Sequence, residues 1–146
     1  MATALAERLA ALGAKPEILH DDLATPSDRA RAANELGASL CLSMVLGLDV
    51  PEESGPTCSY FGSTATYSPA GRRLAELILE ELEREFGRRG LLQRLTVGML
   101  RETRMPAVQI EPLVTVNDVE ASLIGDDGFA PRVARAVAGG ARRFFG

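Results

Sequence analysis

The sequence predicts an α/β fold with a mostly parallel sheet and helices on both of its faces. Three observations carry this prediction. Short apolar runs of strand length alternate along the chain with longer segments whose apolar residues recur at helical spacing. The run over residues 39–48 is apolar almost throughout, which is typical of a strand buried on both faces. A hydroxyl residue followed by proline marks the start of two helices, at Thr25-Pro26 and at Ser68-Pro69.

The first third of the chain predicts helix, strand, helix. Leucines recur on one face over residues 3–12, so we expect a helix there that ends at Gly13. Residues 16–20 are short and apolar in the middle, which predicts a strand. The turn signal at residue 25 predicts a second helix over 26–36, and the apolar strand follows it.

The rest of the chain continues the alternation. We expect strands over 57–61 and 107–111 and a short strand or turn over 97–100. Helices are expected over 69–87, 117–123 and 129–145. Loops are expected over 49–56 and 62–67, and a turn over 125–128. The glutamates of the long helix over 69–87 form its solvated face. No repeat, low-complexity tract or second domain is visible.

Length and composition narrow the classes of protein. With 146 residues the chain has the length of one domain, and 46% hydrophobic residues suffice for a buried core. The net charge of −4 argues against nucleic-acid binding, for which a basic surplus is typical. No apolar run reaches the length of a membrane span, and the first residues lack a secretory signal. The chain as it stands is therefore expected in the cytoplasm.

Few residues are available for metal or thiol chemistry. His20 is the single histidine, and we expect it to be a polar residue at a strand end. Cys41 and Cys58 lie in separate predicted strands without metal-ligand spacing, so we expect buried free thiols. A disulfide between neighbouring strands is the alternative. A nucleophilic role for either thiol is a further hypothesis, against which stand the expected burial of Cys41, where a thiol is inert, and the absence of a histidine near Cys58 in the sequence.

The best candidate for a functional residue is Glu111. It ends the predicted strand over 107–111, and Pro112 follows it without the N–H that would continue a ladder. Ligands of α/β sheets usually bind at the carboxyl ends of the strands, where this acid would lie. A solvated acid at the edge of the sheet is the alternative interpretation.

Two stretches carry a resemblance to a known family. The first contains Arg29, then Ala33-Asn34, then Leu42-Ser43-Met44-Val45; the second contains Leu100-Arg101, then Met105-Pro-Ala-Val-Gln-Ile-Glu111. They resemble the type 3 family of zinc-dependent N-acetylmuramoyl-L-alanine amidases of bacterial cell-wall turnover. That family has an arginine, Ala-Asn and a strand ending Ser-Ile-His, and later Leu-Arg and Met-Pro-Ala-Val-Leu-Val-Glu. The resemblance covers essentially the whole chain and implies a single amidase-like domain, residues 1–146, that lacks the family's first strand and is incomplete at its amino terminus.

The resemblance also implies a zinc site that this chain does not complete. In the family, two histidines and a glutamate hold zinc, and a further glutamate transfers protons. The acid/base position falls on Glu111. The histidine of Ser-Ile-His falls on Val45, whose side chain has no lone pair to offer a metal, and the other two ligand positions fall before Met1. We therefore expect neither metal nor cofactor, a vestigial Glu111, and Arg29, Asn34 and Arg101 as retained motif residues.

Two interpretations of function remain open. In the first, the chain is a non-catalytic domain of peptidoglycan metabolism that binds peptidoglycan, its precursors or a wall-synthesis protein. In the second, it is a fragment of an active zinc amidase that cleaves the amide between muramic acid and L-alanine and is associated with the cell wall. Either way, absence of the family's first strand would expose a strand edge or apolar groove, and we expect it to pair with another chain, such as a second copy.

Overall fold

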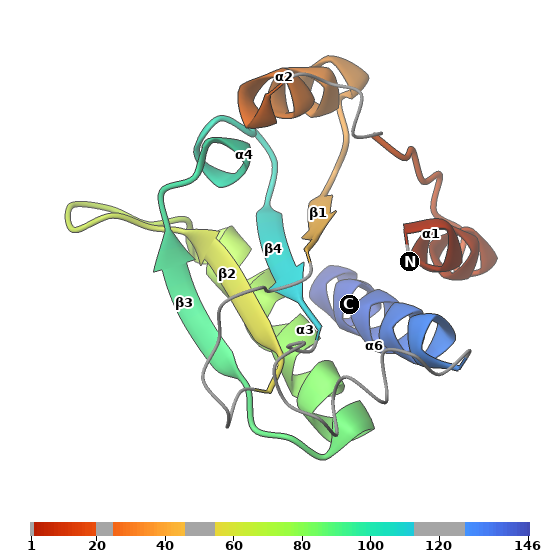
Figure 1. Cartoon of the computed structure of the whole chain (residues 1–146). Coiled ribbons are helices and arrows are strands. Elements are labelled where there is room, and N and C mark those ends of the chain that lie inside the picture. The colour runs from red at the N-terminus through yellow and green to blue at the C-terminus, as the bar shows by residue number, and fades with distance from the viewer. Residues whose placement is uncertain (1, 20–24, 46–54, 113–127) are drawn as a thin grey trace.

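The computed structural model describes residues 2–19, 25–45, 55–112 and 128–146, and their strands form one sheet (Figure 1). The strands are β1 (Cys41–Met44), β2 (Thr57–Phe61), β3 (Leu91–Leu95) and β4 (Ala107–Glu111), in the spatial order β1-β4-β2-β3. β1 pairs with β4 in parallel, as β2 does with β3, whereas β2 and β4 are antiparallel. The predicted, mostly parallel sheet is confirmed, with one antiparallel pair at its centre.

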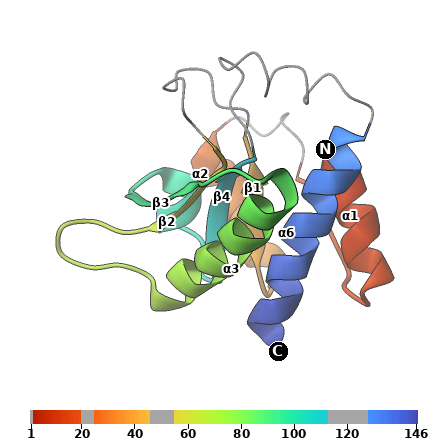
Figure 2. The same ribbon diagram turned by 90° about the horizontal axis from the view of Figure 1, so that it is seen from below.

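Helices cover both faces of the sheet, as predicted (Figures 1 and 2). On one face lie α1 (Ala2–Ala11), α3 (Pro69–Phe86) and α6 (Phe129–Phe145), which share the larger hydrophobic core with the strands. On the other face, α2 (Pro26–Leu36) and α4 (Gly98–Arg101) pack on a smaller core around Cys41 and Ala107. None of the described helices is long and apolar enough to cross a membrane.

The two predicted helix starts are confirmed at the level of single hydrogen bonds. The Ser68 hydroxyl accepts from the Gly71 N–H at 3.0 Å, and the Thr25 hydroxyl accepts from the Asp28 N–H at 3.1 Å. Each satisfies one of the amides that a helix leaves without an internal partner. Both helices end at a glycine, Gly37 or Gly87, with a φ of 64°. That left-handed conformation strains residues with a Cβ, which explains glycine at both ends.

A glycine lets α3 and α6 approach each other closely in the core. A Cβ added to Gly140 would lie 2.6 Å from the Cα of Ile78, whereas one added to Gly139 would meet nothing nearer than 3.8 Å. Gly140 therefore lets the two helix backbones approach, which explains why α6 tolerates a glycine pair that weakens it locally.

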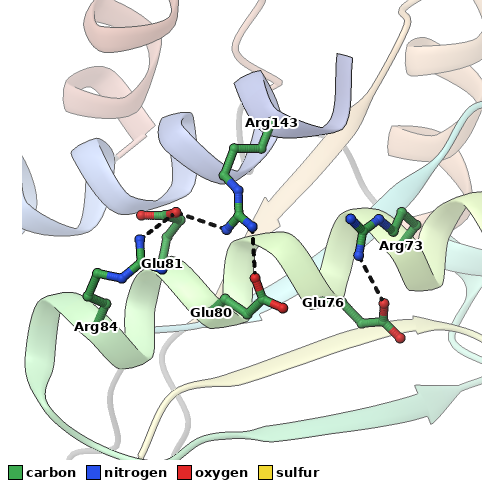
Figure 3. Close-up of polar contacts among 6 residues, drawn as sticks. All are labelled: Arg73, Glu76, Glu80, Glu81, Arg84 and Arg143. Carbon is green, nitrogen blue, oxygen red and sulfur yellow. Dashed lines mark hydrogen bonds and ion pairs between the residues drawn. The ribbon is translucent and has the colours of Figure 1, made fainter. Parts of the chain in front are cut away.

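The solvent-exposed side of α3 carries a series of ion pairs, some of which extend to α6 (Figure 3). Arg143 binds Glu80 and Glu81, each at 3.0 Å, and Arg84 also binds Glu81 at 3.0 Å. The predicted solvated face thus also contributes contacts between helices. Because these side chains are at least partly open to water, which screens their charges, each pair contributes little to stability.

Several predictions of local structure were wrong. Residues 16–19 pair with no described strand, since an extended segment becomes a strand only beside a partner. Residues 98–101 form the short helix α4, and the strand β3 was missed because it lies at an edge, with Leu91 and Arg94 exposed. Leu12 is exposed, although it belongs to the leucine face of the predicted helix over 3–12, which we expected to pack on the core. The predictions for residues 20, 46–54, 117–123 and 125–127 lie outside the described residues.

Candidate functional site

Glu111 lies at the carboxyl end of β4, between Val45 and Thr57. Val45 follows β1 directly, and its N–H donates to the Ile110 carbonyl at 2.9 Å. The parallel register that pairs Met44 with Ile110 therefore places Val45 level with Glu111. On the other side, Thr57 is the antiparallel partner of Glu111. Val45 and Glu111 thus lie side by side at the same end of the sheet.

A row of polar residues crosses the sheet one step inward from Glu111. Ser43 pairs with Gln109, Gln109 with Ser59, and Ser59 with Gln93. Paired residues point to the same face of a sheet, and residues two apart on a strand share that face, so this row and Glu111 lie on one face. Ser59 is buried and its hydroxyl accepts from the Gln93 amide at 3.0 Å, while Ser43 and Gln109 make no side-chain hydrogen bond to the described residues.

The carboxyl group of Glu111 is half-buried and makes no hydrogen bond or ion pair to a described residue. Burial raises the pKa of this carboxyl above its ordinary value, because partial loss of water disfavours the charged form. On the opposite face of the strand end, Ile110 and Cys58 belong to the large core. A carboxyl group that is partly dehydrated and has no counter-ion within the described part of the chain is available to a ligand.

The described residues around Glu111 do not fit a zinc ion. Zinc sites in proteins use thiolate, imidazole and carboxylate ligands, usually three or four of them. Among the residues that the structure describes, no three histidine, cysteine, aspartate or glutamate side chains come together in a way that could hold a metal. Val45 offers carbon atoms alone, and Thr57 would offer a neutral hydroxyl.

Both cysteines are free and buried, as expected. They lie in β1 and β2, which β4 separates, so they are not neighbours across the sheet. Burial raises the pKa of the Cys41 thiol to about 11 and that of Cys58 further still, and in the latter case the charges of Glu83 and Glu111 add to the effect. Because the thiolate is the reactive form, these thiols are inert at neutral pH.

The three motif residues Arg29, Asn34 and Arg101 lie away from Glu111. They belong to α2 and α4, which pack near the amino ends of β1 and β4, whereas Glu111 lies at the carboxyl end of β4 (Figure 1). The Arg101 guanidinium donates to the Thr96 carbonyl at 3.4 Å, whereas the side chain of Arg29 makes no hydrogen bond or ion pair to a described residue. The structure therefore does not bring these motif residues together with Glu111.

Asn34 holds the turn that leads into β4. Its amide nitrogen donates to the Glu102 carbonyl and its amide oxygen accepts from the Arg104 N–H, both at 2.8 Å. The Ser27 hydroxyl also donates to the Glu102 carboxylate, at 2.5 Å. These residues line a shallow polar pocket of about 340 Å³ together with Arg31 and Glu35. Asn34 thus fixes the start of the strand whose far end carries Glu111.

The polar row on the sheet was not predicted, although the sequence contains a signal for it. Each strand has a polar residue at its third position, in Cys-Leu-Ser, Thr-Cys-Ser, Leu-Leu-Gln and Ala-Val-Gln. A single polar residue inside an apolar run marks one face of a strand. Four such positions fall in one line only when the strand register is known, which a single sequence does not provide.

Comparison with known proteins identifies the family. Residues 1–143 match the model of the family described as N-acetylmuramoyl-L-alanine amidase. A curated relative is the N-acetylmuramoyl-L-alanine amidase CwlM of Mycobacterium tuberculosis, with 27% identity over 150 residues, 99% of this chain and 37% of the relative. The chain thus spans little more than a third of that protein.

Solved amidase structures share the fold. The catalytic domain of CwlV from Bacillus (Paenibacillus) polymyxa has a TM-score of 0.78 at 21% identity, with 99% of this chain and 82% of that domain covered. Ami1 from Mycobacterium smegmatis has a TM-score of 0.83 at 22% identity, with 97% and 72% covered. CwlD from Clostridioides difficile, solved in complex with the GerS lipoprotein, has a TM-score of 0.78 at 18% identity, with 98% and 81% covered. By its match over nearly all of its length, the chain belongs to the N-acetylmuramoyl-L-alanine amidase family.

Proposed function

We propose that this chain is an amidase-family domain that binds peptidoglycan or a precursor without hydrolysing it. The observation that carries the proposal is Val45 beside Glu111, at the end of the sheet where ligands of α/β folds bind. In the zinc amidases that the chain resembles, the residue at this position is a zinc-binding histidine. A valine there leaves the acid without the metal chemistry that the family uses.

The chemistry of amide hydrolysis sets the requirement. Family members use zinc, which polarises the carbonyl and lowers the pKa of a bound water to about 7. A lone carboxylate such as Glu111 is a weak general base, and without a metal to polarise the carbonyl and acidify the water it cannot drive attack on an amide at a useful rate. The described neighbours of Glu111 supply no group that could activate it, so we expect no useful rate of cleavage.

The same face of the sheet is suited to binding. Gln109 and Ser43 carry amide and hydroxyl groups without partners among the described residues, next to the half-buried Glu111. Sugars and peptides present hydroxyl and amide groups that such side chains can bind. We propose that the stem peptide or the sugar of a muropeptide lies across this row. A wall-synthesis protein is the alternative ligand.

A second candidate is a fragment of an active zinc amidase. It is favoured by the extent of the match, since the chain spans 37% of CwlM and 82% of the CwlV catalytic domain. Zinc ligands contributed from outside this chain would complete a site next to Glu111. That site would still need another ligand in place of the histidine whose position Val45 occupies.

Two measurements separate these functions. Metal analysis of the purified chain should find no stoichiometric zinc, and incubation with zinc and a defined muropeptide should release no free stem peptide above a Glu111→Ala control. One zinc per chain, or release of stem peptide that depends on Glu111, would instead establish that the chain is a fragment of an active zinc amidase.

The binding claim needs its own test. Titration of the muropeptide, followed by nuclear magnetic resonance, should shift the amides of β4, and Gln109→Leu should weaken binding. Glu35→Ala is the matched control, because this exposed acid lies on α2, near the other end of β4. Equal affinity of all variants would refute a role for this face of the sheet. No binding of the muropeptide at all would refute the proposed ligand and leave a wall-synthesis protein to test.

A further inference from the structure

A short loop carries an exposed tyrosine next to two arginines. Residues 62–67 join β2 to α3 and project from the body of the molecule in both views (Figures 1 and 2). The Arg94 guanidinium lies over the Tyr67 ring, 4.7 Å from its centroid, and that of Arg72 lies 6.0 Å from the same centroid. Guanidinium groups are attracted to the face of an aromatic ring. One ring thus brings together a cation from β3 and a cation from α3.

Arg94 is held in place without an acid. Its Nε–H donates to the Tyr60 hydroxyl at 3.2 Å, and one of its terminal nitrogens donates to the Ser63 carbonyl at 3.5 Å. Gly62 makes room for the stem of this side chain, because a Cβ there would lie 2.7 Å from the Cδ of Arg94. No described carboxylate pairs with Arg94. A guanidinium has five N–H groups, so most of those of Arg94 are left for a ligand.

The Tyr60 hydroxyl also has an unpaired donor. Tyr60 is only 4% exposed, and it belongs to the large core. Its hydroxyl oxygen accepts from Arg94, while its own hydrogen has no acceptor among the residues that the structure describes. A buried donor without an acceptor is costly. The O–H of Tyr60 therefore points to an acceptor that the described part of the chain does not provide.

The charge around this loop is positive, although the whole chain carries −4. Arg72 and Arg73 both pair with Glu76, at 3.0 and 3.6 Å, and Figure 3 shows the second of these contacts. Within the described residues, Glu76 is thus shared by two arginines, and Arg94 has no acid of its own. An excess of positive charge attracts anions from solution.

We propose that Arg94, Arg72 and the Tyr60 hydroxyl bind the phosphate group of a small molecule. A tetrahedral phosphate offers oxygens in several directions, which suits donors that come from β2, β3 and α3, and guanidinium groups match its geometry. A carboxylate offers two oxygens in one plane and fits this arrangement less well. The exposed ring of Tyr67 offers a surface for a sugar or base attached to the phosphate. Free phosphate and a phosphate ester share the proposed chemistry.

This place is separate from the acid at the end of β4. Thr57 pairs with Glu111 at one end of β2, whereas Tyr60 lies toward the other end. Tyr60 also packs in the large core, while its neighbour Ser59 belongs to the polar row on the other face of the sheet. The phosphate proposal is therefore independent of whether the chain binds a muropeptide.

The test titrates the unmodified chain with inorganic phosphate and with glucose 1-phosphate at constant ionic strength, followed by nuclear magnetic resonance. Both anions should shift the Nε–H signal of Arg94 and the amide signals of Gly62 and Ser63 until the shifts saturate, whereas acetate should not. Tighter binding of glucose 1-phosphate would identify an ester as the ligand, and equal affinity would identify free phosphate. The absence of saturating shifts, or equal shifts with acetate, would overturn the proposal and leave Arg94 as a structural contact of the loop.

Substitutions separate binding from support of the loop. Arg94→Gln and Arg72→Gln should each weaken phosphate binding by about tenfold or more, because a charge-assisted hydrogen bond is lost, and Tyr60→Phe should weaken it through loss of the hydroxyl alone. The Arg72 side chain makes no hydrogen bond to the loop, so its variant leaves the loop supported. Arg8→Gln is the matched control, because it removes the same charge from an exposed position on α1, which packs chiefly against α6. Equal affinity of the Arg72 and Arg8 variants would contradict the proposal.

Discussion

Two adjacent glycines in α6 allow a sharp test of how the core is packed. Gly139 and Gly140 occupy neighbouring positions of the same helix, so replacing either by alanine brings the same gain in helix propensity, about 1 kcal/mol. Their surroundings differ. A methyl group at Gly140 would meet the backbone of Ile78 at 2.6 Å, whereas one at Gly139 would be in ordinary contact with the Glu81 side chain at 3.8 Å.

The expected effects have opposite signs. Inserting a methyl group into a well-packed core costs about 1–3 kcal/mol, and because backbone atoms of Ile78 cannot rotate away we take the upper half of that range. Gly140→Ala should then lower the free energy of unfolding by about 1–2 kcal/mol after the propensity gain is subtracted. Gly139→Ala should raise it by about 0.5–1 kcal/mol. The difference between the two variants isolates the cost of the close approach.

Thermal and urea unfolding, monitored by circular dichroism, measures both variants. For a chain of this size about 1 kcal/mol corresponds to 2–4 °C, so the midpoint should fall by several degrees for Gly140→Ala and rise slightly for Gly139→Ala. Separation of the helices should also strain the contacts of Arg143, one turn further along α6, with Glu80 and Glu81 (Figure 3). Two variants that shift the midpoint in the same direction by the same amount would refute the reasoning.

Three further predictions concern single side chains. Asn34→Ala should lower the free energy of unfolding by about 1–2 kcal/mol, because two hydrogen bonds to the turn before β4 are lost; urea midpoints no different from those of Glu35→Ala would contradict this. Ser68→Ala should cost about 1 kcal/mol through loss of the cap of α3, which thermal unfolding can measure, and Ser68→Asp should restore it. Glu111→Gln should stabilise the fold at neutral pH. The folded pKa of this carboxyl is raised, so the unmodified chain loses stability as the pH rises from 4.5 through that value, and the advantage of glutamine should vanish in unfolding measured at or below pH 4.5.

The helices were predictable because their signals are local. Ser68-Pro69 and Thr25-Pro26 cap helices through contacts three residues away, and Gly37 and Gly87 end them through their own backbone conformation. Such signals need no knowledge of the rest of the fold. The strands β1, β2 and β4 were found by their apolar runs, whereas the edge strand β3 has too little burial to stand out.

The arrangement of the site was only partly predictable. That Glu111 ends a strand follows from Pro112 beside it in the sequence, and the resemblance to the amidases put Val45 at a functional position. Val45 and Glu111 lie side by side because β1 pairs with β4, and the paired residues are 66 positions apart in the sequence. No local pattern encodes a pairing over that distance. The separation of Asn34 and Arg101 from Glu111 could not be predicted for the same reason.

The central place of β4 has a consequence for how the chain is made. β1 and β2 both pair with β4 and not with each other, although both precede it in the sequence. During synthesis, β1 and the β2–β3 pair therefore leave the ribosome before they can pair with each other's sheet. They become parts of one sheet only when β4, residues 107–111, has emerged. Contacts between residues so far apart slow folding, and unpaired edges in the meantime favour association with other chains. The nascent chain should be most vulnerable to aggregation just before β4 emerges. Profiling of ribosomes whose nascent chains carry a bound chaperone should therefore show the most chaperone binding at that chain length.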